Sequence, residues 1–145
     1  MKVKDIMTDN PETVGPGTLI GDVAGMMRDL NVGIIPVVRD EELLGVITDR
    51  DITVRVTAAG LLPFEVTVQD FVSPNPVSVS PDDDVEKARQ LMSEHQIRRL
   101  LVTDGNKLVG IVSIGDMATK DRQDDQATGD VLEQISEPSK YDKQL

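Results

Sequence analysis

One seven-residue pattern occurs twice in the chain, each time where a predicted strand runs into a predicted helix. It consists of a glycine, two β-branched residues, a hydroxyl residue, two variable residues and an aspartate, and it occupies residues 45–51 and 110–116. A hydroxyl and an acid three residues apart form a helix capping box, which is the commoner use of such a pattern. The same groups suit a nucleotide, because the hydroxyl can bind a phosphate oxygen and the carboxylate can accept hydrogen bonds from ribose hydroxyls. One residue can serve both uses.

Four side chains carry this hypothesis: Thr48 and Asp51 in the first copy, and Ser113 and Asp116 in the second. No nucleophile stands beside a candidate base, so we predict that the protein is not an enzyme. A small nucleotide hydrolase with Asp49 or Asp51 as its base is an alternative. That alternative needs a metal and a perturbed carboxylate, and the sequence indicates neither.

The composition excludes several classes of protein. The 145 residues include 26 acidic and 15 basic side chains, and the resulting net charge of −11 repels the phosphate backbone of nucleic acids. With no cysteine and a single histidine, His95, we expect no disulfide and no metal site. No apolar run approaches the roughly 20 residues of a membrane span, and we identify no signal peptide. We therefore expect a soluble, cytoplasmic protein with no nucleic-acid or membrane partner.

The elements that must position the repeated pattern are themselves repeated. An offset of 65 positions lays residues 3–52 on residues 68–117 without a gap, and 11 of the 50 aligned pairs are identical. About three identities would be expected from average composition. The identities include an Asn-Pro pair, the glycine and the aspartate of the pattern, which two unrelated amphipathic helices would not keep in register.

Each copy predicts the element order β-α-β-β-α. Apolar residues recur at helical spacing between Leu19 and Leu30, with Thr18 as a candidate N-cap, and again from Val85 to Met92. Short runs rich in Val and Ile predict the strands. The predicted strands are Thr13-Val14, Ile34–Val38 and Leu43–Ile47 in the first copy, and Val77–Val79, Leu100–Thr103 and Leu108–Val112 in the second.

The predicted fold class is therefore α/β (α+β), with two tandem repeats packed by pseudo-two-fold symmetry, because a single copy leaves apolar faces uncovered. We predict repeat 1 over residues 1–60, repeat 2 over 61–120 and an acidic C-terminal tail over 121–145. Residues 53–67 are expected to link the copies. The tail is expected to be partly docked and partly mobile, with one short amphipathic turn at Val131, Leu132 and Ile135.

The repeated unit, the run Thr-Asp-Arg-Asp-Ile at 48–52 and the run Gln-Ile-Arg-Arg-Leu at 96–100 together resemble tandem cystathionine-β-synthase (CBS) domains, a pair called a Bateman module. The resemblance covers residues 1 to about 120 and is greatest to small stand-alone prokaryotic CBS proteins. It implies that the cleft between the two copies binds an adenine nucleotide, AMP, ADP or ATP, with S-adenosylmethionine or NADH as alternatives.

The resemblance also implies roles for individual residues. Ribose binding falls on Asp51 and Asp116, and phosphate binding falls on Thr48 and Ser113. The adenine-facing segments fall on Thr13, Val14, Ile34, Ile35 and Pro36 in the first copy, and on Ser78, Val79, Arg99, Leu100 and Leu101 in the second. Arg50 and Arg98 complete the set of candidate binding residues.

The two copies differ within these segments, so we expect two unequal sites. The first copy keeps the family's Pro36 and has Arg50, where the second has Leu101 and Gly115. Arg98 and Arg99 alternate on a predicted strand, so one is expected to meet a phosphate while the other pairs with a surface acid. Two surface ion pairs of little energetic value are the alternative.

The sequence thus predicts a ligand-sensing regulatory module whose ligand biases the packing of its halves and whose regulated partner protein is unknown. A structural dimerisation or interaction module without ligand is the alternative, but the hydroxyl and aspartate in both copies favour binding. The resemblance also implies a homodimer of stacked pairs. Residues near Met26, Met27 and Met92 could contribute to its face, although ordinary core positions are the commoner use of methionine.

Overall fold

A computed structural model describes residues 1–121 and 125–136 of the chain. The chain is of the mixed α+β class, as predicted, and it divides into two compact units. The first unit comprises residues 12–76 and 106–108, and the second unit comprises residues 1–11, residues 77–105 and the described chain from residue 109 on.

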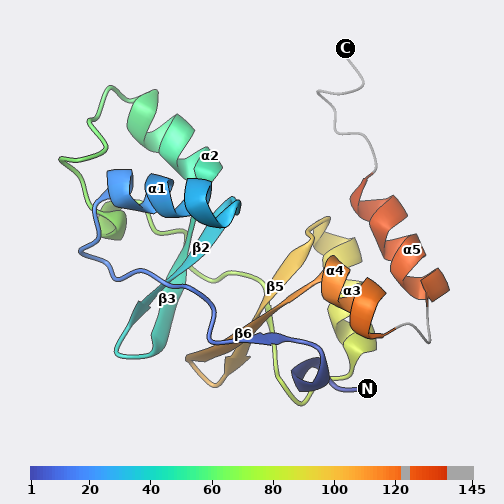
Figure 1. Ribbon diagram of the computed structural model, residues 1–145. Helices are drawn as coiled ribbons and strands as arrows, with labels where there is room; N and C mark the ends of the chain where they lie inside the picture. The colour runs from blue at the N-terminus through green and yellow to red at the C-terminus, as the bar shows by residue number, and fades with distance from the viewer. Residues whose placement is uncertain (122–124, 137–145) are drawn as a thin grey trace, which may run out of the picture. The chain divides into compact units, whose positions relative to one another are not determined.

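The first unit is built on an antiparallel hairpin. Its elements are α1 (Ile20–Leu30), β2 (Ile34–Arg39), β3 (Glu42–Thr48), α2 (Asp49–Asp51), a π-helix (Ile52–Thr57) and a 3₁₀-helix (Val68–Asp70). Strands β2 and β3 pair antiparallel, and Val14 adds a parallel bridge to Val37. Helices α1 and α2 lie on one side of the hairpin (Figure 1), and buried side chains from α1, both strands and the π-helix form one apolar core.

The second unit repeats this plan. Its elements are a 3₁₀-helix (Val3–Asp5), β1 (Thr8–Asp9), β4 (Ser78–Val79), α3 (Val85–His95), β5 (Arg99–Asp104), β6 (Lys107–Ser113), α4 (Ile114–Lys120) and α5 (Asp125–Ile135). The first two residues of β6 are counted with the first unit. Its strand order is β1-β6-β5-β4, with β4 parallel to β5 and β1 antiparallel to β6. The core residues Val85, Met92, Leu100, Val112 and Met117 come from α3, β5, β6 and α4. The predicted β-α-β-β-α order is therefore confirmed, with the first β piece of the first copy reduced to the single bridge of Val14 to Val37.

The first residues of each repeat pack in the unit that holds the remainder of the other repeat. Under the 65-residue offset, residues 3–8 correspond to residues 68–73, and we call these two stretches the opening segments. Residues 3–8 lie in the second unit, where Val3 is fully buried, and residues 68–73 lie in the first unit, where Val68 is fully buried. The predicted ranges 1–60 and 61–120 follow the sequence repeats, whereas the compact units exchange the opening segments.

Two glycines at equivalent positions leave room for the backbone of the opening segments. A Cβ at Gly45 would lie 2.3 Å from the carbonyl oxygen of Ser73, and a Cβ at Gly110 would lie 2.9 Å from that of Thr8. The amide of Ser73 donates to the carbonyl of Val46 at 2.8 Å, and the amide of Val46 donates back at 3.0 Å. The glycine of the repeated pattern is thus required for this close backbone approach.

Two local predictions are wrong. Thr18 is not an N-cap, because α1 begins after Leu19 and the amide of Thr18 instead donates to the carbonyl of Gly15 at 3.2 Å in a turn. The predicted linker also begins too early, because residues 52–57 continue α2 as a π-helix that buries Val56 in the first core.

The C-terminal tail contains more structure than the single predicted turn. Residues 125–135 form the 11-residue helix α5, which packs on α3 and α4 and places Val131 in the second core. The expectation of a partly mobile tail named no particular residues, and residues 122–124 and 137–145 of the tail lie outside the described residues. None of the helices described in residues 1–121 and 125–136 has the length and apolar character to cross a bilayer.

A buried ion pair fixes the end of α4 to α3. Arg89 on α3 donates to the carboxylate of Asp121, and it also donates to Glu86 Oε2 at 3.1 Å. Burial lowers the pKa of Arg89, but the hydrogen bonds to Asp121 and Glu86 outweigh this effect and leave the pKa raised. Arg89 therefore stays charged, and removing Asp121 would leave this buried cation without its buried partner.

Candidate functional site

In the first unit the candidate residues gather where β2 begins, β3 ends and α2 starts. Ile34, the first residue of β2, pairs with Thr48, the last residue of β3. The amide of Val14 donates to the carbonyl of Pro36 at 3.1 Å, which brings the extended segment that contains Thr13 alongside β2. Parallel and antiparallel pairing thus bring three chain segments to one strand–helix junction.

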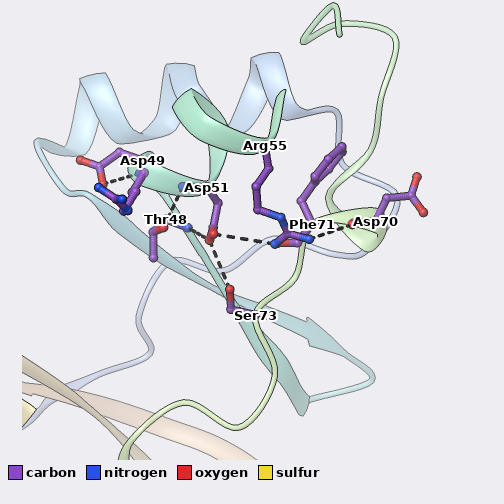
Figure 2. Close-up of polar contacts among 8 residues, drawn as sticks. Thr48, Asp49, Asp51, Arg55, Asp70, Phe71 and Ser73 are labelled. Carbon is purple, nitrogen blue, oxygen red and sulfur yellow. Dashed lines mark hydrogen bonds and ion pairs between the residues drawn. The ribbon is translucent and has the colours of Figure 1, made fainter. Parts of the chain in front are cut away.

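The junction contains a complete capping box, so the structural use of the pattern is confirmed. Thr48 Oγ1 accepts a hydrogen bond from the amide of Asp51 at 3.1 Å, and Asp51 Oδ2 accepts one from the amide of Thr48 at 2.9 Å. Figure 2 shows both side chains beside Ser73, whose hydroxyl also donates to Asp51 Oδ2, at 3.4 Å. The Asp51 side chain remains 15% exposed, while Arg50 next to it is exposed to solvent.

The second unit has the same junction. Ser113 Oγ accepts from the amide of Asp116 at 3.1 Å, and Asp116 Oδ2 accepts from the amide of Ser113 at 2.8 Å. The Asp116 side chain is 17% exposed. Ser78 pairs in parallel with Leu101, which brings the second candidate adenine segment beside β5.

The candidate residues therefore form two groups, one in each unit. Thr13, Val14, Ile34, Ile35, Pro36, Thr48, Arg50 and Asp51 belong to the first unit, and Ser78, Val79, Arg98, Arg99, Leu101, Ser113 and Asp116 belong to the second. Both junctions are stabilised by a further backbone hydrogen bond at equivalent positions. The amide of Asp49 donates to the carbonyl of Gly33, and the amide of Ile114 donates to that of Arg98, each at 2.9 Å.

Two arginines and three methionines outside the capping boxes were singled out in the sequence. Arg98 and Arg99 are both exposed, and within the described residues neither forms an ion pair, so the expected pair with a surface acid is absent there. Met27 and Met92 are buried and Met26 packs against the first core, which matches the ordinary core use of methionine. No cluster of three or more His, Cys, Asp or Glu side chains in the described residues could hold a metal ion.

Two basic residues that contact the site carboxylates were not among the predicted site residues. Arg55 Nη1 lies 3.7 Å from Asp51 Oδ1, and Lys120 Nζ lies 3.5 Å from Asp116 Oδ1. Each cation is four residues after its aspartate, and the two cations are related by the 65-residue offset. A basic residue conserved in position between the two copies was the signal that could have identified them.

Each junction thus presents a hydroxyl, a partly exposed carboxylate and strand-end backbone groups. A carboxylate has about four lone-pair positions, so the hydrogen bonds of the capping box leave acceptor capacity on Asp51 and Asp116. These groups can bind a ligand that carries neighbouring hydroxyls. They do not form a nucleophile–base pair.

Comparison with known proteins agrees with this geometry. The model of the CBS domain matches residues 3–57 and, a second time, residues 68–121. The CBS domain-containing protein YhcV of Bacillus subtilis is 45% identical over 134 residues, which are 92% of this chain and 94% of that protein.

Solved structures show the same architecture. Hypoxic Response Protein I with two coordinated zinc ions matches with a TM-score of 0.72 and 33% identity, over 81% of this chain and 97% of that one. CBSX2 in complex with AMP matches with a TM-score of 0.71 and 30% identity, over 84% and 96% of the two chains. Given the double match of the family model and the extent of these similarities, the chain belongs to the CBS-domain family and contains two copies of the domain.

Proposed function

We propose that the protein is a regulatory module that binds an adenine nucleotide and has no catalytic activity of its own. One observation carries the proposal: the same pair of a hydroxyl and a partly exposed carboxylate occurs at the same strand–helix junction of both units. The AMP complex of CBSX2, which is similar over 84% of this chain, supports the choice of ligand.

In this proposal the capping boxes hold the ligand-binding groups in place. Asp51 and Asp116 accept hydrogen bonds from the ribose hydroxyls, and Thr48 and Ser113 bind phosphate oxygens. The adenine ring lies against the strand ends near Pro36 in the first unit and near Leu101 in the second. AMP, ADP and ATP are the first candidates, with S-adenosylmethionine and NADH as alternatives.

The ligand acts by stabilising one arrangement of the protein over another, and a second protein responds to that arrangement. The two sites have unequal affinities, because the first site has Pro36 and Arg50 where the second has Leu101 and Gly115. The functional form is a homodimer, and neither nucleic acid nor a membrane is a partner.

A thermal-shift screen with AMP, ADP, ATP, NADH and S-adenosylmethionine tests the proposal. A ligand at one hundred times its dissociation constant stabilises the folded state by about 2.7 kcal/mol, which raises the melting temperature of a chain of this size by roughly 5–10 °C. GMP at the same concentration is the control for nonspecific effects of a nucleotide. The absence of a shift with every adenine compound at millimolar concentration would favour the structural dimerisation module. Release of phosphate from ATP with magnesium would favour the hydrolase.

A further inference from the structure

Arg55 connects the carboxylate of the first site to the opening segment that docks beside it. Its Nη1 lies 3.7 Å from Asp51 Oδ1 and donates to the carbonyl of Phe71 at 3.0 Å, while its Nη2 donates to the carbonyl of Asp70 at 3.4 Å. The guanidinium also stacks over the Phe71 ring, 5.5 Å from its centroid. Figure 2 shows Arg55 between Asp51 on one side and Phe71 and Asp70 on the other.

Lys120 makes the same connection in the second unit. Its Nζ lies 3.5 Å from Asp116 Oδ1 and donates to the carbonyl of Ile6 at 3.1 Å. All three members of this arrangement obey the 65-residue offset: Asp116 corresponds to Asp51, Lys120 to Arg55, and Ile6 to Phe71. The donor differs, but the carboxylate, the cation and the accepting carbonyl recur at equivalent positions.

An isolated ion pair at i,i+4 on a partly exposed helix contributes little, and one such pair would need no functional explanation. Here each cation also makes a charge-assisted hydrogen bond to the backbone of a segment from elsewhere in the chain; Lys120 and Ile6 are 114 residues apart. An accidental surface pair would not place the same carbonyl of the opening segment on the same cation in both units. Each cation therefore contacts both the site carboxylate and the docked opening segment, so a movement of either one changes the position of the cation.

We propose that Arg55 and Lys120 are positioning residues that couple nucleotide binding to the docking of the opening segments. A ligand that holds Asp51 also holds Arg55, and through it the segment 68–73; a docked segment in turn holds Asp51 ready for the ligand. The coupling is reciprocal, as linkage requires. This inference rests on the proposed function, because it takes the two aspartates as ligand-binding groups.

The test follows single amides by NMR during titration with AMP. The chemical shift of the Asp51 amide reports occupancy of the first site, and hydrogen exchange of the Ser73 amide, which donates to the carbonyl of Val46 at 2.8 Å, reports docking of the segment. In the wild-type protein, AMP shifts the Asp51 resonance and slows exchange at Ser73. In Arg55→Met, AMP no longer slows that exchange, and its affinity falls by about five- to tenfold, the effect of losing about one hydrogen bond.

Two matched variants separate coupling from a general loss of charge. Arg55→Lys retains the response to AMP, since a lysine fills this role in the second unit. Arg28→Met removes an equally basic side chain from α1 and leaves both readouts unchanged, because Arg28 pairs with the exposed side chain of its neighbour Asp29, away from the site. Loss of the Ser73 response in Arg28→Met as well would overturn the inference, because the effect would then be one of net charge.

The outcomes distinguish this inference from the function on which it rests. Suppose that AMP shifts the Asp51 resonance of the wild-type protein but does not change hydrogen exchange at Ser73, or that it slows this exchange as much in Arg55→Met as in the wild type. Either result overturns the coupling and leaves nucleotide binding standing. If neither AMP nor ATP shifts the Asp51 resonance in the wild-type protein, the proposed function fails and the inference fails with it.

Discussion

The aspartate of the repeated pattern has one demonstrated role, in the capping box, and one proposed role, in ribose binding. The two roles predict different consequences for Asp51→Asn and Asp116→Asn. Loss of the box alone costs up to about 1 kcal/mol of the free energy of unfolding and leaves affinity unchanged. Loss of hydrogen bonds to a charged group weakens nucleotide binding by roughly 1.5–3 kcal/mol. We expect both effects, with the larger loss of affinity in Asp51→Asn because the first site has Pro36 and Arg50.

Urea unfolding and titration calorimetry on each variant measure the two quantities separately. Asp49→Asn is the matched control, because Asp49 is the first residue of α2, is exposed and lies outside the capping box. It should leave nucleotide affinity unchanged. Unaltered affinity in both Asp51→Asn and Asp116→Asn would leave these residues with only the capping role.

At the residue scale, the contacts that could be predicted from the sequence are those between residues close together along the chain. Thr48 and Asp51 could be identified because a capping box joins residues three apart. The i,i+4 spacing of Asp51 and Arg55 is equally local, but its significance depends on the carbonyl of Phe71, which reaches Arg55 only through tertiary packing. No spacing pattern in the sequence predicts the contact between Arg55 and the Phe71 carbonyl.

At the scale of elements, docking of the opening segments depends on two glycines, and Gly45→Ala should impair it. A Cβ there would lie 2.3 Å from the Ser73 carbonyl oxygen and 2.6 Å from a methyl carbon of Val72, so the backbone must separate. We expect a loss of about 2–3 kcal/mol in the free energy of unfolding, toward the upper end of overpacking effects. Gly110→Ala should cost less, because a Cβ there would lie 2.9 Å from the Thr8 carbonyl oxygen and 2.8 Å from the flexible Met7 side chain, so the backbone has to move less.

Gly17→Ala is the control for this pair, since nothing lies within 4 Å of a Cβ at that position. Urea unfolding of the three variants gives the order of their free energies of unfolding. Equal stability of Gly45→Ala and Gly17→Ala would contradict the close docking of segment 68–73 in solution.

The strands and the two long helices of the repeats could be predicted from the sequence, whereas α5, the π-helix and the exchange of the opening segments could not. Strands and long helices can be recognised from the periodicity of their apolar residues. The structure places α1, β2 and β3 within one residue of the predicted bounds, while α3 extends three residues beyond its predicted end. The opening segments form 3₁₀-helices of three residues, too short to show a period. The two opening segments also have apolar residues at the same buried positions, Val3 and Ile6 in one and Val68 and Phe71 in the other. Their hydrophobicity therefore does not indicate which of the two cores each segment enters.

At the scale of the whole molecule, one surface stretch differs from the rest in charge. The chain has 26 acidic residues, yet residues 52–64 contain none of them. In the same stretch Val54, Leu61, Leu62 and Phe64 are 49%, 40%, 59% and 65% exposed. Two copies with a net charge of −11 repel each other, so an apolar stretch free of carboxylates is where they can meet at least electrostatic cost.

We therefore predict a homodimer that buries residues 52–64, and we expect light scattering to give twice the 15.8 kDa mass of the chain. Leu62→Glu should shift the protein toward monomer, because each interface then gains two buried like charges. Leu132→Glu, which changes an equally apolar residue that is 44% exposed on α5, should leave the dimer intact. Added salt should strengthen the wild-type dimer, since it screens the repulsion between acidic copies without weakening apolar contact. Dimers that dissociate with salt, or that survive Leu62→Glu unchanged, would require a different and more polar interface.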